Sequence, residues 1–394
     1  MSFDVKQAYD AVYAWAEAEG FAGADPFDGL ESRIFQATPL KHIALARLAW
    51  LQMVKRAAVD LRDTLRVPKG VNAKGIALFA LAELSRFRDT LDEVHKRNAL
   101  EHLATLRGLA ISGRTTDDKP TKAFGYNFDW QSRAFYAPKG TPTIVPTAFA
   151  ARAFIESYQL FGDDEDLNFV VEICRFIVSD LNRPHEDENT ICFSYTPRDR
   201  SLIFNASLLA GETLASASAF TDDAAFIELA AKSARYVIEN QKKDGSWAYG
   251  PKLRHAWVDN FHTAFILLSL KRIREAIPAI DSADAIRRGF DFWVENLFLP
   301  DGTPMYYDSE IFPVDIHSAA AAIAVLAQFG DEDDRALPLA EKVAAWTIEN
   351  MRDADGYFYY QIRKDETITI PFIRWGQAWM AYALATLLEA RKIS

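Results

Sequence analysis

The sequence contains only two cysteines among 394 residues, Cys174 and Cys192, and their spacing is not that of a metal site. Two isolated thiols exclude a disulfide framework and are typical of a reducing compartment. No uncharged apolar run approaches the length of a membrane-spanning helix, and the first residues lack the basic and apolar pattern of a signal peptide. We therefore expect a cytoplasmic protein without a membrane span.

Positive charge is also scarce. The sequence has 44 Lys and Arg residues and 55 Asp and Glu residues, which gives a net charge of −11. An acidic surface disfavours nucleic acid and anionic membranes as partners. A Gly-rich phosphate loop and a His-Glu-x-x-His motif are both missing. We therefore expect no cofactor and no bound metal.

Aromatic residues are abundant, at 13%, and many of them lie in a recurring loop. The loop begins with Asp, often continues with Gly, and then carries aromatic residues. Its copies begin at Asp187, Asp244, Asp301 and Asp355. A more diverged copy surrounds Asp129. A repeat of about 55 residues is typical of ring-shaped and solenoid folds.

Two helices are expected between successive loops. The first is rich in Ala and Leu and nearly uncharged, whereas the second is amphipathic. A helix that is apolar on all sides is buried, and a striped helix lies at the surface. We expect an inner ring at residues 73–86, 144–162, 203–218, 259–274, 315–329 and 374–391. We expect an outer ring at residues 39–66, 89–110, 165–183, 223–241, 283–297 and 335–351.

This helix count predicts an all-α fold, an (α/α)6 toroid formed by six helical hairpins. We expect one domain over residues 1–394, with short β-hairpin-like loops at one end and residues 1–35 as an N-terminal helical extension. The turns from inner to outer helices are acidic. One of them, Asp163–Asp166, resembles the Asp-rich metal motif of prenyl-transferring enzymes, but similar turns recur, so helix capping explains it better.

Polar residues collect where the inner helices begin, at the end that carries the aromatic loops. In two successive repeats Asp259 is followed by His262, and Asp315 by His317. Either Asp is a suitable helix cap, but capping does not explain the histidines. A saccharide does, because it stacks on aromatic rings and binds polar groups through its hydroxyls. The residues expected to contact it are Asn127, Trp130, Gln131, Arg133, Tyr195, Asn205, Trp247, Asn260, Tyr307, Arg374, Trp375 and Gln377.

Arginines in these loops and helix starts suggest an acidic or phosphorylated saccharide. They are Arg133, Arg198, Arg254 and Arg374. An Arg at a helix N-terminus, such as Arg374, is unfavourable unless an anion lies beside it. That anion is either the ligand or a neighbouring Asp. The first alternative predicts that Arg374→Ala weakens ligand binding by more than it lowers the melting temperature.

Two kinds of chemistry fit these residues. Glycoside hydrolysis needs two carboxyl groups, for which Asp129, Asp259 and Asp315 are the candidates. Epimerisation or elimination needs a base that removes a carbon-bound proton, for which His262 or His317 would serve. Two alternatives stay open: a non-catalytic protein that binds a glycan or a lipid-linked intermediate during polysaccharide assembly, and a prenyltransferase- or terpene-cyclase-like protein.

Motifs along the whole chain carry a family resemblance. They are Asp25–Leu30, Asn72–Gly75, Gly125–Gln131, Phe193–Pro197, Asp259–Thr263, Asp315–Ser318 and Arg374–Trp379. They resemble a bacterial and archaeal family encoded beside polysaccharide biosynthesis genes, often described as prenyltransferase or squalene-oxidase repeat proteins. The repeat is also similar to six-hairpin glycosidases and sugar epimerases. The resemblance implies a toroid and a role in polysaccharide metabolism.

Overall fold

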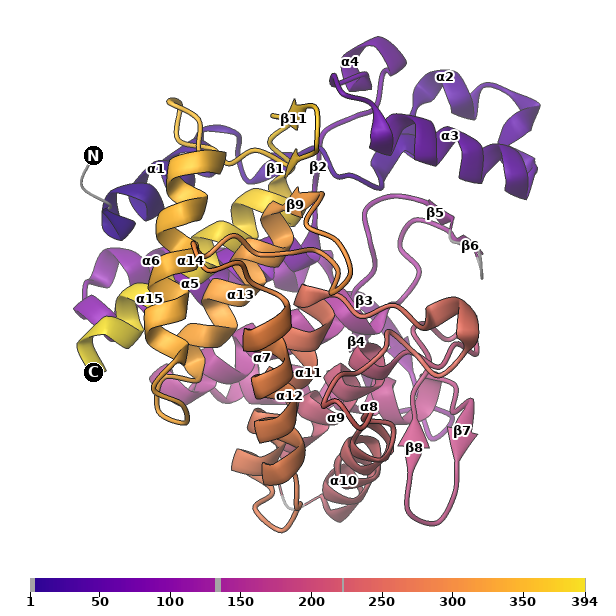
Figure 1. Cartoon of the computed structure of the whole chain (residues 1–394). Coiled ribbons are helices and arrows are strands. Elements are labelled where there is room, and N and C mark those ends of the chain that lie inside the picture. Colours follow the sequence, from indigo (N-terminus) through magenta and orange to yellow (C-terminus); the bar gives the residue numbers. More distant parts are fainter. Residues whose placement is uncertain (1–3, 132–135, 222, 394) are drawn as a thin grey trace. The chain divides into compact units, whose positions relative to one another are not determined.

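The computed structural model describes residues 4–131, 136–221 and 223–393, which are mainly helical with short strands (Figure 1). The chain divides into two compact units. Unit 1 comprises residues 1–106, 125–141 and 312–394, and unit 2 comprises residues 107–124 and 142–311. None of the helices in the described part combines the length and the apolar character that a membrane crossing requires.

Unit 2 consists of three helix pairs. The inner helices are α7 (Ile144–Phe161), α9 (Phe204–Ser218) and α11 (Asn260–Ala276). The outer helices are α8 (Asp164–Asp180), α10 (Ala224–Glu239) and α12 (Ala283–Asn296). Helix α9 packs against both α7 and α11. The Ala- and Leu-rich helices are therefore the buried ones, as predicted.

Acidic residues join the inner to the outer helix in two of the three pairs of unit 2. Gly162 ends α7 in the left-handed conformation, with φ of 70°, and the Asp163 carboxylate caps α8 by accepting a hydrogen bond from the N–H of Glu165. Asp223 caps α10 in the same way, through the N–H of Ala225. Helix capping thus accounts for the acidic turns.

Unit 1 also contains three helix pairs. The inner helices are α5 (Ala73–Thr90), α13 (Ile316–Gln328) and α15 (Ala378–Ile393). The outer helices are α6 (Glu93–Leu109), α14 (Ala336–Met351) and α1 (Val5–Ala18). Helix α15 packs against α5, α13 and α1. A π-helical turn, η4 (Ile373–Gln377), precedes α15.

Helix α1 takes the place of the sixth outer helix, for which the sequence had suggested residues 39–66. It packs against α15 and α14 (Figure 1). Gly356, in the last aromatic loop, lies against Ala11 of α1, just as Gly245 in an earlier loop lies against Arg288 of the outer helix α12. The same loop-to-helix contact in both units identifies α1 as the partner of α15.

Residues 39–66 form three short elements instead of one helix. They are η2 (Pro39–His42), α3 (Ala44–Arg56) and α4 (Arg62–Leu65). Only Leu51 and Val54 of α3 are buried, so little apolar surface stabilises a longer helix. The Asp60 carboxylate then accepts a hydrogen bond from the N–H of Arg62, which favours a turn over a continuing helix.

The aromatic loops share one turn geometry. Gly245, Gly302 and Gly356 have φ values of 91°, 95° and 99°, a region that is unfavourable for residues with a side chain.

Short antiparallel strands border the helix pairs. They are β1 (Ala22–Gly23) with β2 (Gly70–Val71), β3 (Ile111–Arg114) with β4 (Pro120–Ala123), β5 (Trp130–Gln131) with β6 (Tyr136–Ala137), β7 (His185–Glu186) with β8 (Ile191–Cys192), and β10 (Gln361–Ile362) between β9 (Val314–Asp315) and β11 (Thr367–Ile368).

Candidate active site

Asp259 and His262 form a hydrogen-bonded pair at the start of α11 in unit 2. The Asp259 carboxylate caps the helix by accepting a hydrogen bond from the backbone N–H of His262 at 2.9 Å. Its other oxygen lies 2.6 Å from Nδ1 of His262 and accepts a hydrogen bond from the Trp257 indole at 3.1 Å. The carboxylate is 3% exposed. The buried Asp259 side chain therefore both caps α11 and orients the His262 ring.

This pairing defines the proton positions on His262. A carboxylate only accepts hydrogen bonds, so Nδ1 carries the proton and Nε2 is the basic nitrogen of the neutral ring. Nε2 has no hydrogen-bond partner among the residues that the structure describes, and the side chain is 21% exposed. The arrangement is that of a general base held in orientation by a carboxylate.

Aromatic rings surround His262. The Tyr249 and Trp257 rings stack with centroids 4.8 Å apart, and Tyr249 lies 4.6 Å from the His262 ring. His255, which sequence reasoning missed because it lies outside the repeated motif, packs edge-on against Tyr249 and Trp257. Burial, together with Arg254 and Lys252, lowers the pKa of His255. Trp257 is 39% exposed and thus offers an accessible aromatic surface.

Three other predicted contact residues of unit 2 differ in their surroundings. Asn205, in the first turn of α9, is 4% exposed, and its Oδ1 has no hydrogen-bond partner in the described part of the chain. Tyr195 is partly buried, and its carbonyl accepts a hydrogen bond from the N–H of Ile144. Tyr307 is partly buried and forms a backbone bridge with Asp259. Substrate contact by these residues stays a prediction.

Asn260 and Trp247 have structural surroundings that leave little room for substrate. The Asn260 amide donates to the carbonyl of Leu297 and accepts from the Trp293 indole, and the side chain is fully buried. Trp247 is 2% exposed, and its indole donates to a carbonyl of α10. Both side chains therefore lie in the core of unit 2 and contribute to its packing, and substrate contact by them stays a prediction.

Asp315 and His317 begin α13 in unit 1 but do not repeat the geometry of unit 2. The Asp315 carboxylate accepts hydrogen bonds from the N–H of His317 at 2.8 Å, from the Trp375 indole at 2.9 Å and from the Gln361 amide. His317 follows its Asp by two residues rather than three, and its Nδ1 bonds instead to the carbonyl of Trp375 at 3.0 Å. The His317 ring stacks on Trp375 with centroids 4.1 Å apart.

The Asp315 carboxyl is fully buried, and burial raises its pKa to about 6. The three hydrogen bonds and the charge of Lys55 oppose this shift. All three donors are neutral, and they occupy both carboxylate oxygens. The group is therefore held as a helix cap in a core of aromatic rings.

Arg374 forms a buried ion pair with Asp25. Nε of Arg374 lies 2.6 Å from Oδ2 of Asp25, and Nη2 lies 2.8 Å from Oδ1. The guanidinium also lies 5.2 Å from the ring centroid of Tyr126. Of the two anions considered for this helix start, the structure thus supplies the protein carboxylate. Asp25 belongs to a motif of the family resemblance, which was the one signal that could have identified it.

Gln377 is also structural. Its amide accepts a hydrogen bond from the N–H of Phe358 and donates to the carbonyl of the same residue, and its side chain is fully buried. It therefore secures the last aromatic loop to the start of α15. Substrate contact by Gln377 stays a prediction.

The diverged loop of unit 1 contains Asp129 and its neighbours. The Asp129 carboxylate accepts hydrogen bonds from the Tyr136 hydroxyl at 2.5 Å and from the N–H of Lys139 at 2.7 Å, which closes the β5–β6 hairpin. Gln131 accepts a hydrogen bond from Arg47. Two further predicted residues lie nearby: Asn127 accepts a hydrogen bond from Asn72, and Trp130 packs on Tyr126. Arg133 lies outside the described residues.

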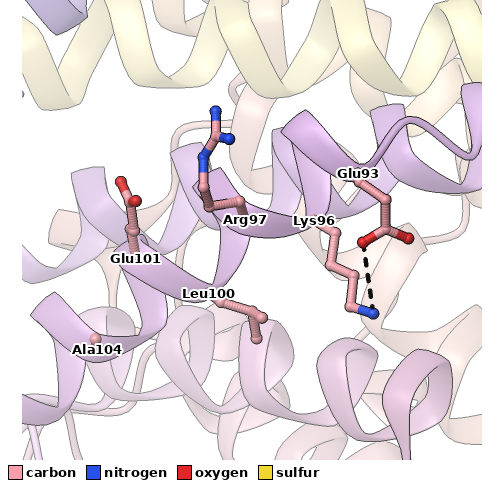
Figure 2. Close-up of a pocket in the computed structure, with 6 residues that line it drawn as sticks. All are labelled: Glu93, Lys96, Arg97, Leu100, Glu101 and Ala104. Carbon is pink, nitrogen blue, oxygen red and sulfur yellow. Dashed lines mark ion pairs between the residues drawn. The ribbon is translucent and has the colours of Figure 1, made fainter.

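Figure 2 shows a pocket elsewhere, on the outer helix α6. It is lined by Glu93, Lys96, Arg97, Leu100, Glu101 and Ala104. Glu93 and Lys96 form an ion pair of 3.7 Å along the helix. None of the predicted site residues lines this pocket, so we do not place the active site there.

No family model matches the sequence, and no curated protein matches it. Several solved structures are similar to it. A cellobiose 2-epimerase from Bacillus thermoamylovorans B4167 has a TM-score of 0.63 at 13% identity, covering 82% of this chain and 88% of the other. A GH76 α-mannanase from Bacteroides thetaiotaomicron has a TM-score of 0.62 at 12% identity, covering 81% and 86%. A glycosyl hydrolase of family 88 from Bacteroides vulgatus has a TM-score of 0.57 at 10% identity, covering 80% and 91%. At these identities the similarity shows the fold, and the chain has the predicted (α/α)6 toroid fold of these proteins.

Proposed function

We propose that the protein is an enzyme that acts on a saccharide in polysaccharide metabolism. The stacked Tyr249 and Trp257 rings beside Asp259 and His262 support this proposal, since a sugar presents an apolar face next to its hydroxyls. The fold, shared with sugar epimerases and glycosidases, is consistent with it but does not decide function. The resemblance of its motifs to a family encoded beside polysaccharide biosynthesis genes supports the metabolic context.

The reaction that this geometry supports best is proton abstraction from carbon. The single observation that carries it is the 2.6 Å contact of the Asp259 carboxylate with Nδ1 of His262, which leaves Nε2 basic. Nε2 takes a proton from a carbon next to a carbonyl or carboxylate group; the C–H electron pair forms a carbon–carbon double bond, and the C=O π pair moves onto that group's oxygen. Addition of a proton from solvent to the opposite face of this intermediate gives an epimer. Loss of a substituent from the adjacent carbon gives an unsaturated sugar instead.

Hydrolysis by the three candidate carboxylates has less support. Asp259 and Asp315 are buried helix caps with both oxygens hydrogen-bonded. Asp129 is partly buried and closes a hairpin. A general acid and a second carboxylate must both reach the glycosidic bond. The hydrogen bonds of these three carboxylates hold them in helix caps and a hairpin rather than free to contact a glycosidic bond.

The prenyl alternative also has less support. The Asp-x-Asp-Asp pattern that triterpene cyclases use occurs at Asp331–Asp334. This segment is the turn before α14 and is mostly exposed, and Asp333 pairs there with Arg335. The acidic residues thus fit the turn from inner to outer helix that recurs in this chain.

Exchange of carbon-bound hydrogen tests the proposal directly. Purified protein is incubated in D2O with aldoses (mannose and cellobiose) and uronic acids (glucuronate and galacturonate), and the C–H signals are followed by proton NMR. We expect deuterium to replace the proton next to the carbonyl or carboxylate of at least one sugar. His262→Asn should slow this exchange by about 100-fold or more, because general-base catalysis contributes factors of that order.

His42→Asn provides the control, since His42 is exposed on η2. It should exchange at the wild-type rate. Release of reducing ends from a glycan without deuterium uptake would show a hydrolase instead. Binding of a sugar with neither exchange nor cleavage would show a non-catalytic binding protein.

A further inference from the structure

Lys55, on α3 of unit 1, has an ammonium group without a conventional partner. The Nζ atom lies 4.0 Å above the centroid of the Phe27 ring. It forms no hydrogen bond and no ion pair with any residue that the structure describes. An ammonium has three donors, and leaving them unused near buried groups is costly. Sequence reasoning missed Lys55 because it placed residues 39–66 in an outer helix, away from the helix starts where the site was expected.

Lys55 adjoins the aromatic group at the start of α13 and α15. Phe27, beneath the ammonium, packs edge-on against Trp375 at 5.5 Å, and Trp375 stacks on His317 and donates to Asp315. The rings of Phe27 and Trp375 therefore lie between Lys55 and the polar start of α13, which the sequence analysis had identified. Lys55 as a whole is partly exposed rather than buried.

The nearby carboxylates are already engaged. Asp25 is occupied by Arg374, and Asp315 holds three neutral donors. Burial lowers the pKa of Lys55 to about 8, while Asp315 and Asp25 act in the opposite direction. Lys55 thus remains mostly charged at neutral pH, and no protein carboxylate lies within ion-pair distance of it among the described residues.

The surrounding segment is basic although the chain as a whole is acidic. Residues 33–66 contain seven Lys and Arg and two Asp, a net charge of +5 in a chain of −11. Arg33, Arg56 and Arg66 of this segment are exposed. A concentrated positive charge of this kind attracts anionic ligands and orients them.

We propose that Lys55 binds the anionic group, a carboxylate or a phosphate, of an acidic saccharide beside Trp375. The saccharide part of this proposal rests on the proposed function. The anion would take the ammonium donors that the protein leaves unused, while Phe27, which packs against Trp375, supplies the apolar side of the contact. The competing explanation is a lysine held only by its contact with Phe27, which predicts no discrimination between charged and neutral sugars.

Ligand selectivity tests this proposal. Wild-type protein, Lys55→Met and Lys55→Arg are titrated at pH 7 with glucuronate, glucose 6-phosphate, inorganic phosphate and glucose, and dissociation constants are measured by ligand-observed NMR. Wild type should bind one of the acidic sugars more tightly than glucose and inorganic phosphate. Lys55→Met should weaken that binding by about 10- to 150-fold, as for loss of one charge-assisted hydrogen bond, and leave glucose binding unchanged. Lys55→Arg should retain part of the selectivity.

Lys364→Met is the matched control, since Lys364 is exposed in the β10–β11 hairpin, and it should bind like wild type. Equal affinity of wild type and Lys55→Met for the acidic sugars would overturn the proposal. So would binding of inorganic phosphate without any acidic sugar. Failure of the proposed function is distinguishable, because it would appear as a lack of deuterium exchange. That exchange is measured in a separate assay and does not depend on the charge of Lys55.

Discussion

Arg374 and Asp25 form a bidentate ion pair across 349 residues of sequence, with N–O distances of 2.6 and 2.8 Å. Both side chains are at most 5% exposed. The pair neutralises a cation at the helix start, where the peptide dipoles disfavour positive charge. No ligand is therefore needed to explain Arg374, and the pair ties the segment after α1 to η4 within unit 1.

Arg374→Ala should lower stability more than it affects ligand binding. The substitution leaves the Asp25 carboxylate buried without its partner, at a cost of about 3–5 kcal/mol. Unfolding in urea measures this loss. Arg391→Ala, which removes a partly exposed pair with Glu341, should cost less than about 1 kcal/mol. A fully stable Arg374→Ala protein with weakened sugar binding would contradict this prediction and favour the ligand alternative.

Asp259→Asn should separate capping from catalysis. Asn caps helices as well as Asp does, so the melting temperature should change little. The amide can donate to Nδ1 of His262, which moves the proton to Nε2 and removes the base. We expect deuterium exchange to slow by about 100-fold or more. Asp259→Ala should lose the cap as well, at about 1 kcal/mol. A wild-type exchange rate in Asp259→Asn would show that the pair has no catalytic role.

Gly289→Ala should destabilise unit 2, because a Cβ at this position of α12 would lie 2.3 Å from the Trp247 ring. Overpacking of this kind costs about 1–3 kcal/mol. Gly108→Ala in α6 is the matched control, since its Cβ would meet no atom within 4 Å. The control should be neutral or stabilising, because Ala favours a helix over Gly. Thermal unfolding of both variants measures the difference, and equal melting temperatures would refute the packing role of Trp247.

His102 should make stability depend on pH. It is buried among the rings of Phe21 and Phe79, and burial lowers its pKa to about 4. Below about pH 6.5 the His102 side chain binds a proton in the unfolded chain but stays neutral in the folded protein. The free energy of unfolding therefore falls as the pH drops towards 4. His102→Gln removes this contribution. The stability difference between wild type and His102→Gln should change by about 2 kcal/mol between pH 7 and pH 5, measured by urea unfolding. Parallel pH profiles would contradict it.

Much of the fold was predictable because it is encoded locally. The helix pairs of unit 2 begin and end within a few residues of the predicted ranges, since apolar periodicity, Gly ends and Asp caps all act within one or two turns. The repeated Gly of the aromatic loops is equally local, because its positive φ depends on its own backbone. The capping role of Asp259 and of Asp315 was foreseen for the same reason.

The sequence by itself determined which residues form the inner helices and, with the exception of α1, the outer helices, and where polar residues begin them, because those properties depend on neighbours a few positions away. Only the tertiary structure decided which polar groups meet. It paired α1 with α15, Asp25 with Arg374, and left Lys55 without a protein carboxylate. Such contacts join residues hundreds of positions apart, and their partners depend on how the helices pack rather than on any local pattern.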